Sequence, residues 1–415
     1  MQQSQNKKTN ERFLAISFCA VLFLPAVNNF LNCFFQMGMD AEVPYLTETS
    51  YITMMLLGVF SALRSVTKNA GIFFVSALIL VGCAVSYFIY PEMRKAIYED
   101  PVDLIYNPIN RVVFFCVPAL IYSAALTSYD GLFALMTKWA RVTLVIGVFT
   151  FYYVYFVADG ILQYMVFSYF MLTPICVCFE NYLQHHQKKD LVLYLLGFFA
   201  ILLCGARGAI LSFLIYFVIR LLSHKGKGNS APIAKLILAF ILFLVIFFWE
   251  DILVWLYDFT VELGIDSRFI TSLIKGTLSE SSGRDTIAEA IFKGIESNPF
   301  GYGLFGDRYV VGSFDFRGYT YAHNFFLEII CSFGIFFSIP ILLMFFNKLF
   351  KAISRKDIYY NRVLWSLIPY GFFQLFFSSS AIENVAFYMI CAIIFKNNKR
   401  SSGETERIEK NNEGM

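Results

Sequence analysis

Three ionisable residues could together perform chemistry on a charged substrate. Arg207 interrupts a run of mostly apolar residues, Arg284 stands at the start of a predicted helix, and His323 directly precedes a hydrophobic segment. A guanidinium binds phosphate oxygens in pairs and keeps its charge. An imidazole can accept a proton near neutral pH. These residues therefore suit attack of a hydroxyl on a lipid-linked pyrophosphate, in which the arginines stabilise the departing diphosphate and the histidine takes the proton, with no metal and no cofactor.

A purely structural interpretation competes with this one. A charge within an apolar run is costly and usually faces a partner or a watery cavity. Arg207 could therefore form a salt bridge, for which Asp159 is the candidate partner. His323 could be a packed residue at the membrane boundary.

The composition predicts an all-α integral membrane protein. Of the 415 residues, 58% are hydrophobic and only 15% are charged, and the mean hydropathy is +0.61. Soluble domains keep about a quarter of their residues charged. Apolar runs near the ~20 residues that cross a bilayer recur along the chain. We expect about twelve transmembrane helices, at 13–35, 51–66, 71–90, 111–127, 142–158, 161–180, 191–205, 207–222, 235–256, 323–346, 363–380 and 382–396.

Lysine and arginine in the short connectors predict the orientation. Alternate connectors are basic, and both terminal segments belong to the basic set. The termini are therefore expected in the cytoplasm, and the polar segment 257–321 on the opposite side. Among four histidines, His323 is then the one on the outer face.

Four parts of the chain follow from this pattern. We expect an N-terminal bundle of about nine helices at 1–256 and an extracytoplasmic loop with an amphipathic helix at 257–322. C-terminal transmembrane helices follow at 323–396, and a disordered cytoplasmic tail at 397–415.

The loop contains one helix with clear start and stop signals. Ser282 can cap a helix that begins at Arg284, and Asn298-Pro299 ends it near Glu296. Glu289 and Lys293 form an i,i+4 pair. The helix carries an apolar stripe that we expect to lie against the membrane or the top of the bundle, formed by Ile287, Ile291, Phe292 and Ile295.

A glycine-rich turn follows the helix, from Gly301 to Gly306. Its spacing matches a dinucleotide fingerprint, but no strand precedes it, so we expect no nucleotide or nucleic acid there. Glycine instead permits close backbone approach to a ligand or a neighbouring helix. Besides Arg207 and Arg284, we assign substrate binding to Gly301, Gly303, Asn324, Arg308 and Arg317.

Several short motifs together resemble one bacterial family. Their order and outward placement, between Leu191 and Phe345, are similar to the O-antigen polymerase and O-antigen ligase superfamily. The motifs are Gly205-Ala-Arg207-Gly208, Gly283-Arg284 before a helix, Asn298-Pro-Phe-Gly-Tyr-Gly303, and Ala322-His323-Asn324-x-x-Leu327-Glu328 followed by Gly334-Ile335.

The resemblance implies a twelve-helix, GT-C-like membrane glycosyltransferase. Its substrates would be undecaprenyl-diphosphate-linked oligosaccharides at the outer face of the inner membrane, and a chain-length regulator would be a partner. The family's two arginines map onto Arg207 and Arg284 and its histidine onto His323, while Ala206 replaces the usual serine. Polymerases and ligases share these residues. The stretch from Tyr321 to Glu328 looks more like the polymerase members.

Two other functions fit the same sequence less well. A transporter or flippase would show internal repeats and broken helix pairs, and no repeat is apparent here. A metal-dependent transferase would use the acidic pair Asp40-x-Glu42, although paired acidic residues in a solvated loop are commonplace.

Overall fold

The described part of this computed structural model is entirely helical. The structure describes residues 2–39, 46–63, 70–91, 108–158, 164–223, 249–262, 270–271, 274, 283–313 and 321–396. Its elements are α1 (Gln2–Met39), α2 (Leu46–Leu63), α3 (Ala70–Ile89), α5 (Pro108–Arg111), the π-helix η3 (Val112–Cys116), α6 (Val117–Ala125), α7 (Tyr129–Phe156), α8 (Tyr164–His185), α9 (Lys188–Cys204), α10 (Arg207–Ser223), α12 (Trp249–Glu262), α14 (Arg284–Ser297), α15 (Gly306–Ser313), α16 (Phe325–Ile353), α17 (Ile358–Gly371), the 3-10 helix η5 (Phe373–Phe376) and α18 (Val385–Phe395).

The long helices confirm an integral membrane protein. Within the described ranges, six are long and apolar enough to cross a bilayer: Gln5–Phe35, Gly71–Ile89, Pro108–Ala125, Tyr129–Phe156, Met165–His185 and Phe325–Ile353. Shorter apolar helices cover Ile52–Leu63 and Val385–Phe395. The expected number of twelve stays a prediction, and most of the expected span 235–256 lies outside the described residues.

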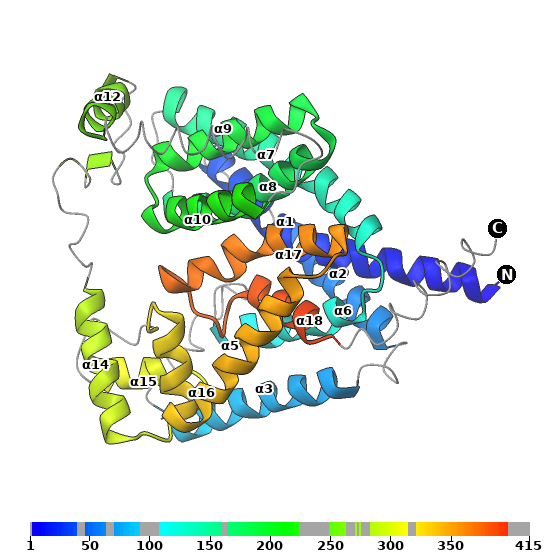
Figure 1. The fold of residues 1–415 in the computed structure, drawn as a ribbon, viewed down its shortest axis with the longest axis vertical. Helices are drawn as coiled ribbons and strands as arrows, with labels where there is room; N and C mark the ends of the chain where they lie inside the picture. Colours follow the sequence, from blue (N-terminus) through cyan, green and yellow to red (C-terminus); the bar gives the residue numbers. More distant parts are fainter. Residues whose placement is uncertain are drawn as a thin grey trace.

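Helix α8 lies at the centre of the bundle. It packs against α1, α7, α9, α10 and α17. Of the residues in its most apolar stretch, 78% are buried. Helix α3 is the opposite case, because only 17% of the residues in its most apolar stretch are buried. Such a helix presents most of its surface to lipid. The helices form a stack of roughly parallel rods (Figure 1).

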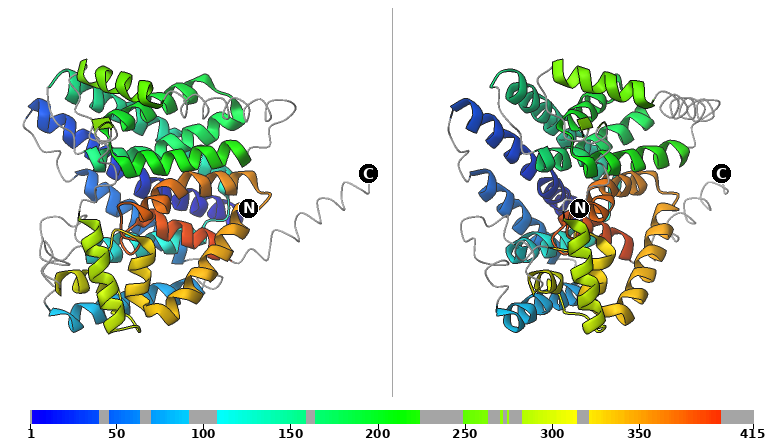
Figure 2. Two further views of the ribbon diagram at one scale, coloured as in Figure 1. Left: turned by 60° about the vertical axis from the view of Figure 1, so that its left-hand side comes forward. Right: turned by 90° about the vertical axis from the view of Figure 1, so that its left-hand side faces the viewer.

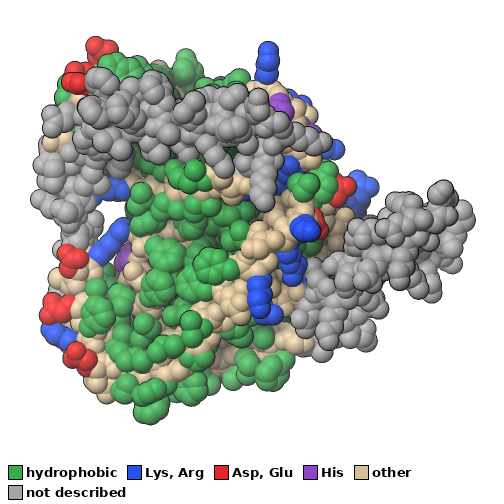
Figure 3. All heavy atoms as spheres, in the orientation of Figure 1, with side chains coloured by type: hydrophobic (Ala, Val, Ile, Leu, Met, Phe, Trp, Pro, Cys, Tyr) green, Lys and Arg blue, Asp and Glu red, His purple; other side chains and the backbone are tan. Residues whose placement is uncertain are grey.

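The two ends of the stack differ. Helix α14 crosses one end, on the left of Figure 1, and the first residues of α1 lie at the other end. With the first end facing the viewer, α14 (yellow-green) lies in front of the bundle (Figure 2, right). On the face that Figure 3 shows, hydrophobic side chains cover most of the described surface between the ends, and charged side chains gather mainly toward the edges. This distribution fits a bilayer that surrounds the middle of the stack.

The loop helix forms where the sequence predicts it. Helix α14 spans Arg284–Ser297, and Lys293 binds Glu289 at 2.7 Å. Its apolar side packs on α15 and α16, with Ile291 and Ile295 buried. Phe292 does not share that side, since it is 55% exposed. The residue before the helix is Gly283, in the left-handed conformation with φ of 82°, and it makes no side-chain cap.

The end of the chain departs from the expected spans. Helix α17 ends at Gly371, whereas the sequence suggested a span to residue 380. A short 3-10 helix and irregular backbone follow until α18 begins at Val385. The irregular segment is stabilised by tertiary hydrogen bonds, because buried Glu328 accepts from the amides of Ala381 and Ile382 at 2.6 and 3.4 Å.

Candidate functional site

Arg207 begins helix α10, directly after a tight turn. Helix α9 ends at Cys204, and Gly205 takes the left-handed conformation with φ of 77°. Two residues thus join α9 to α10, close to the boundary between the expected spans 191–205 and 207–222. A Cβ at Gly208 would collide with the Tyr169 hydroxyl of α8, so a larger residue there would force the tyrosine ring to shift. The half-buried Arg207 is therefore fixed at the end of the bundle by the close packing of α10 on α8.

Arg284, like Arg207, is the first residue of a helix. It is the first residue of α14, and a left-handed glycine again precedes it. Its side chain is exposed. Because the N-terminal end of a helix carries partial positive charge, both arginines add a guanidinium to an already positive helix end. Each position suits an anion better than a cation.

His323 stands in a strained turn that its neighbours stabilise. Its φ is 53°, in the left-handed region, where few residues other than glycine are found. On one side, Asp307 accepts a hydrogen bond from the Ala322 amide at 2.9 Å. On the other side, Asn324 caps α16 by accepting from the amides of Phe326 and Leu327 at 3.0 and 3.3 Å. The turn presents the imidazole at the start of α16.

The surroundings keep His323 neutral. Burial, followed by the positive charges of Arg284 and Arg308, lowers the pKa of His323 from 6.5 to about 4. Within the described part of the chain, its buried Nδ1 has no hydrogen-bond partner. A neutral imidazole with a free nitrogen can accept a proton from a bound hydroxyl.

Arg308 supplies a buried cation next to the histidine. It lies on α15, 3% exposed, and pairs with Glu383 from the irregular segment before α18. The Asp307 carboxylate lies 3.7 Å from it. Arg308 was expected to bind substrate. Its ion pair with Glu383 gives it a structural partner, and substrate binding by this residue stays a prediction.

Tyrosines connect the separate parts of the site. Tyr321 stacks near His323, with ring centroids 4.0 Å apart, and donates a hydrogen bond to the Ser378 carbonyl at 3.0 Å. Burial raises the pKa of Tyr321, and the nearby charges of Arg308, Arg284 and Arg111 oppose that rise. Three guanidinium groups therefore lie within electrostatic reach of the Tyr321 hydroxyl, and that of Arg308 lies 5.7 Å from the ring centroid.

Tyr169 links Arg207 to this cluster. It contacts Gly208, the residue after Arg207, its hydroxyl pairs with Ser378, and it lies within electrostatic reach of Arg284 and Tyr321. Helices α8, α10, α14 and α16, which are far apart in the sequence, thus converge at one end of the bundle. Arg284 lies within electrostatic reach of His323, and Gly208, the residue after Arg207, packs on Tyr169.

The glycine turn contacts a helix. Gly301 and Gly303 have φ of 89° and 80°, and the turn docks where Gly334 breaks α16, with φ of 72° and ψ of 165°. The amides of Tyr302 and Gly303 donate to the carbonyls of Cys331 and Ser332 at 2.8 and 2.9 Å. This packing explains the glycines, and their assignment to substrate binding stays a prediction.

Several residues near the site were not predicted from the sequence. Asp307, Tyr169 and Arg111 gave no motif signal, because only folding brings them to the turn that contains Tyr321 and Ala322. Glu383 did give one: a carboxylate within an apolar run indicates a buried charge that needs a partner. That partner is Arg308.

Other predicted residues cannot be placed. Arg317, Asp159 and the Asp40-x-Glu42 pair lie outside the described residues. Within the described ranges, no three His, Cys, Asp or Glu side chains gather as metal ligands. Metal independence stays a prediction.

Comparison with known proteins gives one match, which covers part of the chain. Residues 192–342 match a family model described as O-antigen ligase. The resemblance to the O-antigen polymerase and ligase superfamily is confirmed there. The matched segment runs from α9 to the first part of α16 and contains Arg207, Arg284 and His323. It indicates a glycosyltransferase-like enzyme. No curated protein and no solved structure matches the chain.

Proposed function

We propose that this protein is a polysaccharide polymerase. It transfers a glycan chain from undecaprenyl diphosphate onto a lipid-linked repeat unit, such as that of O-antigen or capsule, at the outer face of the bacterial inner membrane. The observation that carries the proposal is the neutral His323, which lies beside Arg284 and Arg308 inside the segment that matches the family. Both termini then lie in the cytoplasm and α14 outside.

The proposed reaction is a displacement at the anomeric carbon. An acceptor hydroxyl attacks that carbon, the bond to the diphosphate oxygen breaks, and the electron pair leaves with the diphosphate. Arg207 and Arg284 stabilise the departing charge, and His323 takes the hydroxyl proton. Bound diphosphate also offsets the positive field on His323. This raises the pKa of His323 from its low value and makes it a better base when substrate is present.

Transfer to lipid A-core sugar, as by a ligase, is the second candidate. The description of the matched family model favours it, whereas the likeness of the Tyr321–Glu328 stretch to polymerase members favours polymerisation. A single gel of surface glycan from a deletion strain separates the two. A polymerase deletion leaves core plus one repeat unit, and a ligase deletion leaves core alone while lipid-linked polymer accumulates.

A purified assay tests the chemistry itself. The protein in detergent is incubated with undecaprenyl-diphosphate-linked repeat units, and chain growth is followed with and without EDTA. We expect growth that EDTA leaves unchanged. Loss of transfer with EDTA, restored by a divalent cation, would instead support a metal site such as the Asp40-x-Glu42 pair.

A further inference from the structure

The irregular segment between η5 and α18 packs against the start of α10. The Cβ of its first residue, Phe377, lies 3.2 Å from the place where a Cβ at Gly208 would be. The next residue, Ser378, pairs its hydroxyl with that of Tyr169 on α8. Because Gly208 directly follows Arg207, this end of the segment contacts the helix start that carries the arginine.

The same segment holds the turn that contains His323. The Ser378 carbonyl accepts a hydrogen bond from the Tyr321 hydroxyl at 3.0 Å, and the centroids of the Tyr321 and His323 rings are 4.0 Å apart. Further along the segment, Glu383 pairs with Arg308 of α15, the helix that also accepts a hydrogen bond from the turn. The segment therefore connects the histidine side of the site with the arginine side.

Glu328 on α16 is the acceptor that fixes the middle of the segment. Its carboxylate accepts hydrogen bonds from the amides of Ala381 and Ile382 at 2.6 and 3.4 Å and from the Ser380 hydroxyl. Glu328 is 1% exposed and lies inside the apolar helix Phe325–Ile353. An ionisable side chain in such a helix is costly and usually has a function. Here three donors from one segment offset that cost.

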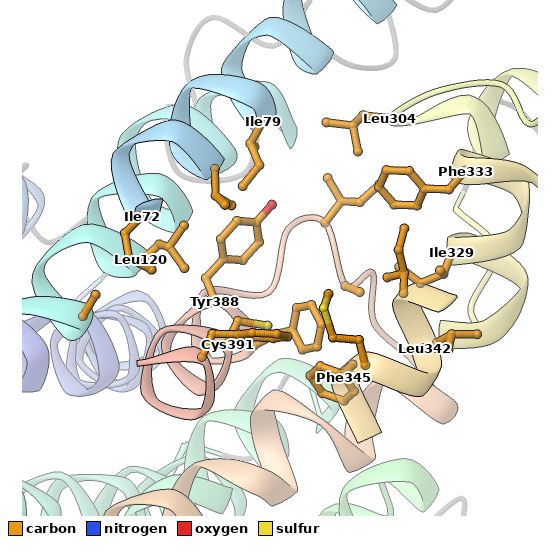
Figure 4. Close-up of a pocket in the computed structure, with 18 of the residues that line it drawn as sticks. Ile72, Ile79, Leu120, Leu304, Ile329, Phe333, Leu342, Phe345, Tyr388 and Cys391 are labelled. Atoms are coloured by element: carbon orange, nitrogen blue, oxygen red, sulfur yellow. The ribbon is translucent and has the colours of Figure 1, made fainter. Parts of the chain in front are cut away.

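The segment also borders an apolar cavity of about 560 Å³, which lies between α3, α16 and α18 (Figure 4). Ala381 and Ile382 line the cavity, as does Ile329, the residue after Glu328. Apolar walls offer no acceptor to a backbone amide, and an unpaired buried amide costs free energy. The two amides, and with them the conformation of the segment, therefore depend on the Glu328 carboxylate.

We propose that Glu328 is a positioning residue for glycan transfer, because it fixes the irregular segment and the segment sets the place of His323 relative to Arg207. The inference rests on the proposed function. Since Glu328 is buried, it acts on geometry and does not touch the substrate. A displacement of about 1 Å between a base and the groups that bind the leaving diphosphate can lower the rate by about 100-fold.

Two substitutions of Glu328 separate hydrogen bonding from charge. Glu328→Met keeps a side chain of similar length and removes both acceptor oxygens, so we expect kcat to fall by about 100-fold with little change in KM. Glu328→Gln has no charge but keeps an oxygen for the Ala381 amide, so its kcat should stay within about tenfold of that of the unsubstituted protein. Steady-state kinetics of detergent-purified protein with undecaprenyl-diphosphate-linked repeat units measures both. Equal losses in the two variants, or a raised KM with unchanged kcat, would overturn the proposal.

Tyr321→Phe tests the contact between segment and turn without altering the buried carboxylate. It keeps the ring beside His323 and removes the hydrogen bond to the Ser378 carbonyl, so we expect kcat to fall by about tenfold. Tyr360→Phe is the matched control and should leave kcat unchanged, since the buried Tyr360 hydroxyl also donates to a backbone carbonyl, that of Ile393 at 3.3 Å. Tyr360 lies in the first turn of α17, at the end opposite the segment. The same kcat in both variants would also contradict the proposal.

Chemical modification of His323 tests the positioning without catalysis. Diethyl pyrocarbonate reacts with neutral imidazole, and burial is the main cause of the low pKa of His323. Release of the segment in Glu328→Met should expose the imidazole and raise this pKa toward 6.5, which mass spectrometry of the His323 peptide across pH measures. An unchanged midpoint would overturn the proposal whether or not the protein transfers glycan. A raised midpoint, with no transfer by the unsubstituted protein, would contradict the proposed function alone.

Discussion

The Asp307 carboxylate accepts a hydrogen bond from the Ala322 amide at 2.9 Å, and this bond holds the turn on which His323 stands. Asp307 is fully buried and belongs to α15, eighteen residues before the start of α16. Its role is to position the histidine.

Substitution of Asp307 should change the rate of transfer more than the binding of substrate. Asp307→Ala removes the acceptor and leaves a buried amide unpaired, so we expect kcat to fall by about 100-fold with little change in KM. Asp307→Asn keeps an acceptor oxygen and should retain much more activity. Steady-state kinetics of detergent-purified protein measures both. Equal activity of Asp307→Ala and the unsubstituted protein would exclude the positioning role.

The pH dependence of His323 follows from the arginines around it. With a pKa of about 4 in place of 6.5, the imidazole is neutral, and able to act as a base, at any pH well above 4. Arg284→Gln removes one opposing charge, so the pKa should rise toward 6.5. Diethyl pyrocarbonate reacts with neutral imidazole, and mass spectrometry of the His323 peptide across pH measures this pKa without catalysis. An unchanged or lower midpoint in Arg284→Gln would contradict the electrostatic account.

The arginines at the two helix starts should be needed for transfer. We expect Arg207→Ala, Arg284→Ala and His323→Ala each to reduce chain elongation by about 100-fold or more, with membrane insertion intact. Lys293→Gln is the control, since Lys293 also lies on α14, is exposed and pairs with exposed Glu289. Full-length polymer from all three variants would show that the site lies elsewhere.

Substitution of either positive-φ glycine of the glycine turn should lower the stability of the protein, and we expect a larger loss at Gly301 than at Gly303. A Cβ at Gly301 would meet the backbone of Gly334 and lie 2.8 Å from the Ser332 carbonyl oxygen, whereas at Gly303 its nearest neighbour is the Ser86 hydroxyl at 3.4 Å. Gly303→Ala should therefore cost about 1 kcal/mol, for the backbone conformation alone. Gly301→Ala should cost about 3 kcal/mol or more, because close-packed backbone must also shift. Thermal unfolding in detergent compares them, and a smaller effect at Gly301 would refute the docking role.

Local patterns in the sequence were enough to predict the loop helix and the helix turn. Arg284 and Asn298 bound an amphipathic repeat, and Gly205 ends one apolar run two residues before the next. These features depend on neighbours within a few residues. For the same reason the sequence singled out Arg284, at a helix start, and His323, at the edge of a span.

Contacts between distant segments were beyond such reasoning. No local pattern indicates that Arg308 pairs with Glu383, 75 residues later. Nor does any pattern indicate that α17 ends at Gly371, which lets residues 378–383 reach Glu328 and Tyr321. Hydrophobicity alone predicts a membrane span for such a stretch. It cannot reveal that a buried carboxylate elsewhere in the chain accepts hydrogen bonds from the backbone amides of that stretch.

By itself the sequence determined that this chain crosses a membrane and that two arginines and a histidine mark its polar loop and boundaries, because hydrophobicity and helix signals are local properties. Only the tertiary structure decided that His323 is neutral and that Asp307 holds its turn. Each of these depends on burial and on charges from several helices, which exist only once those helices pack.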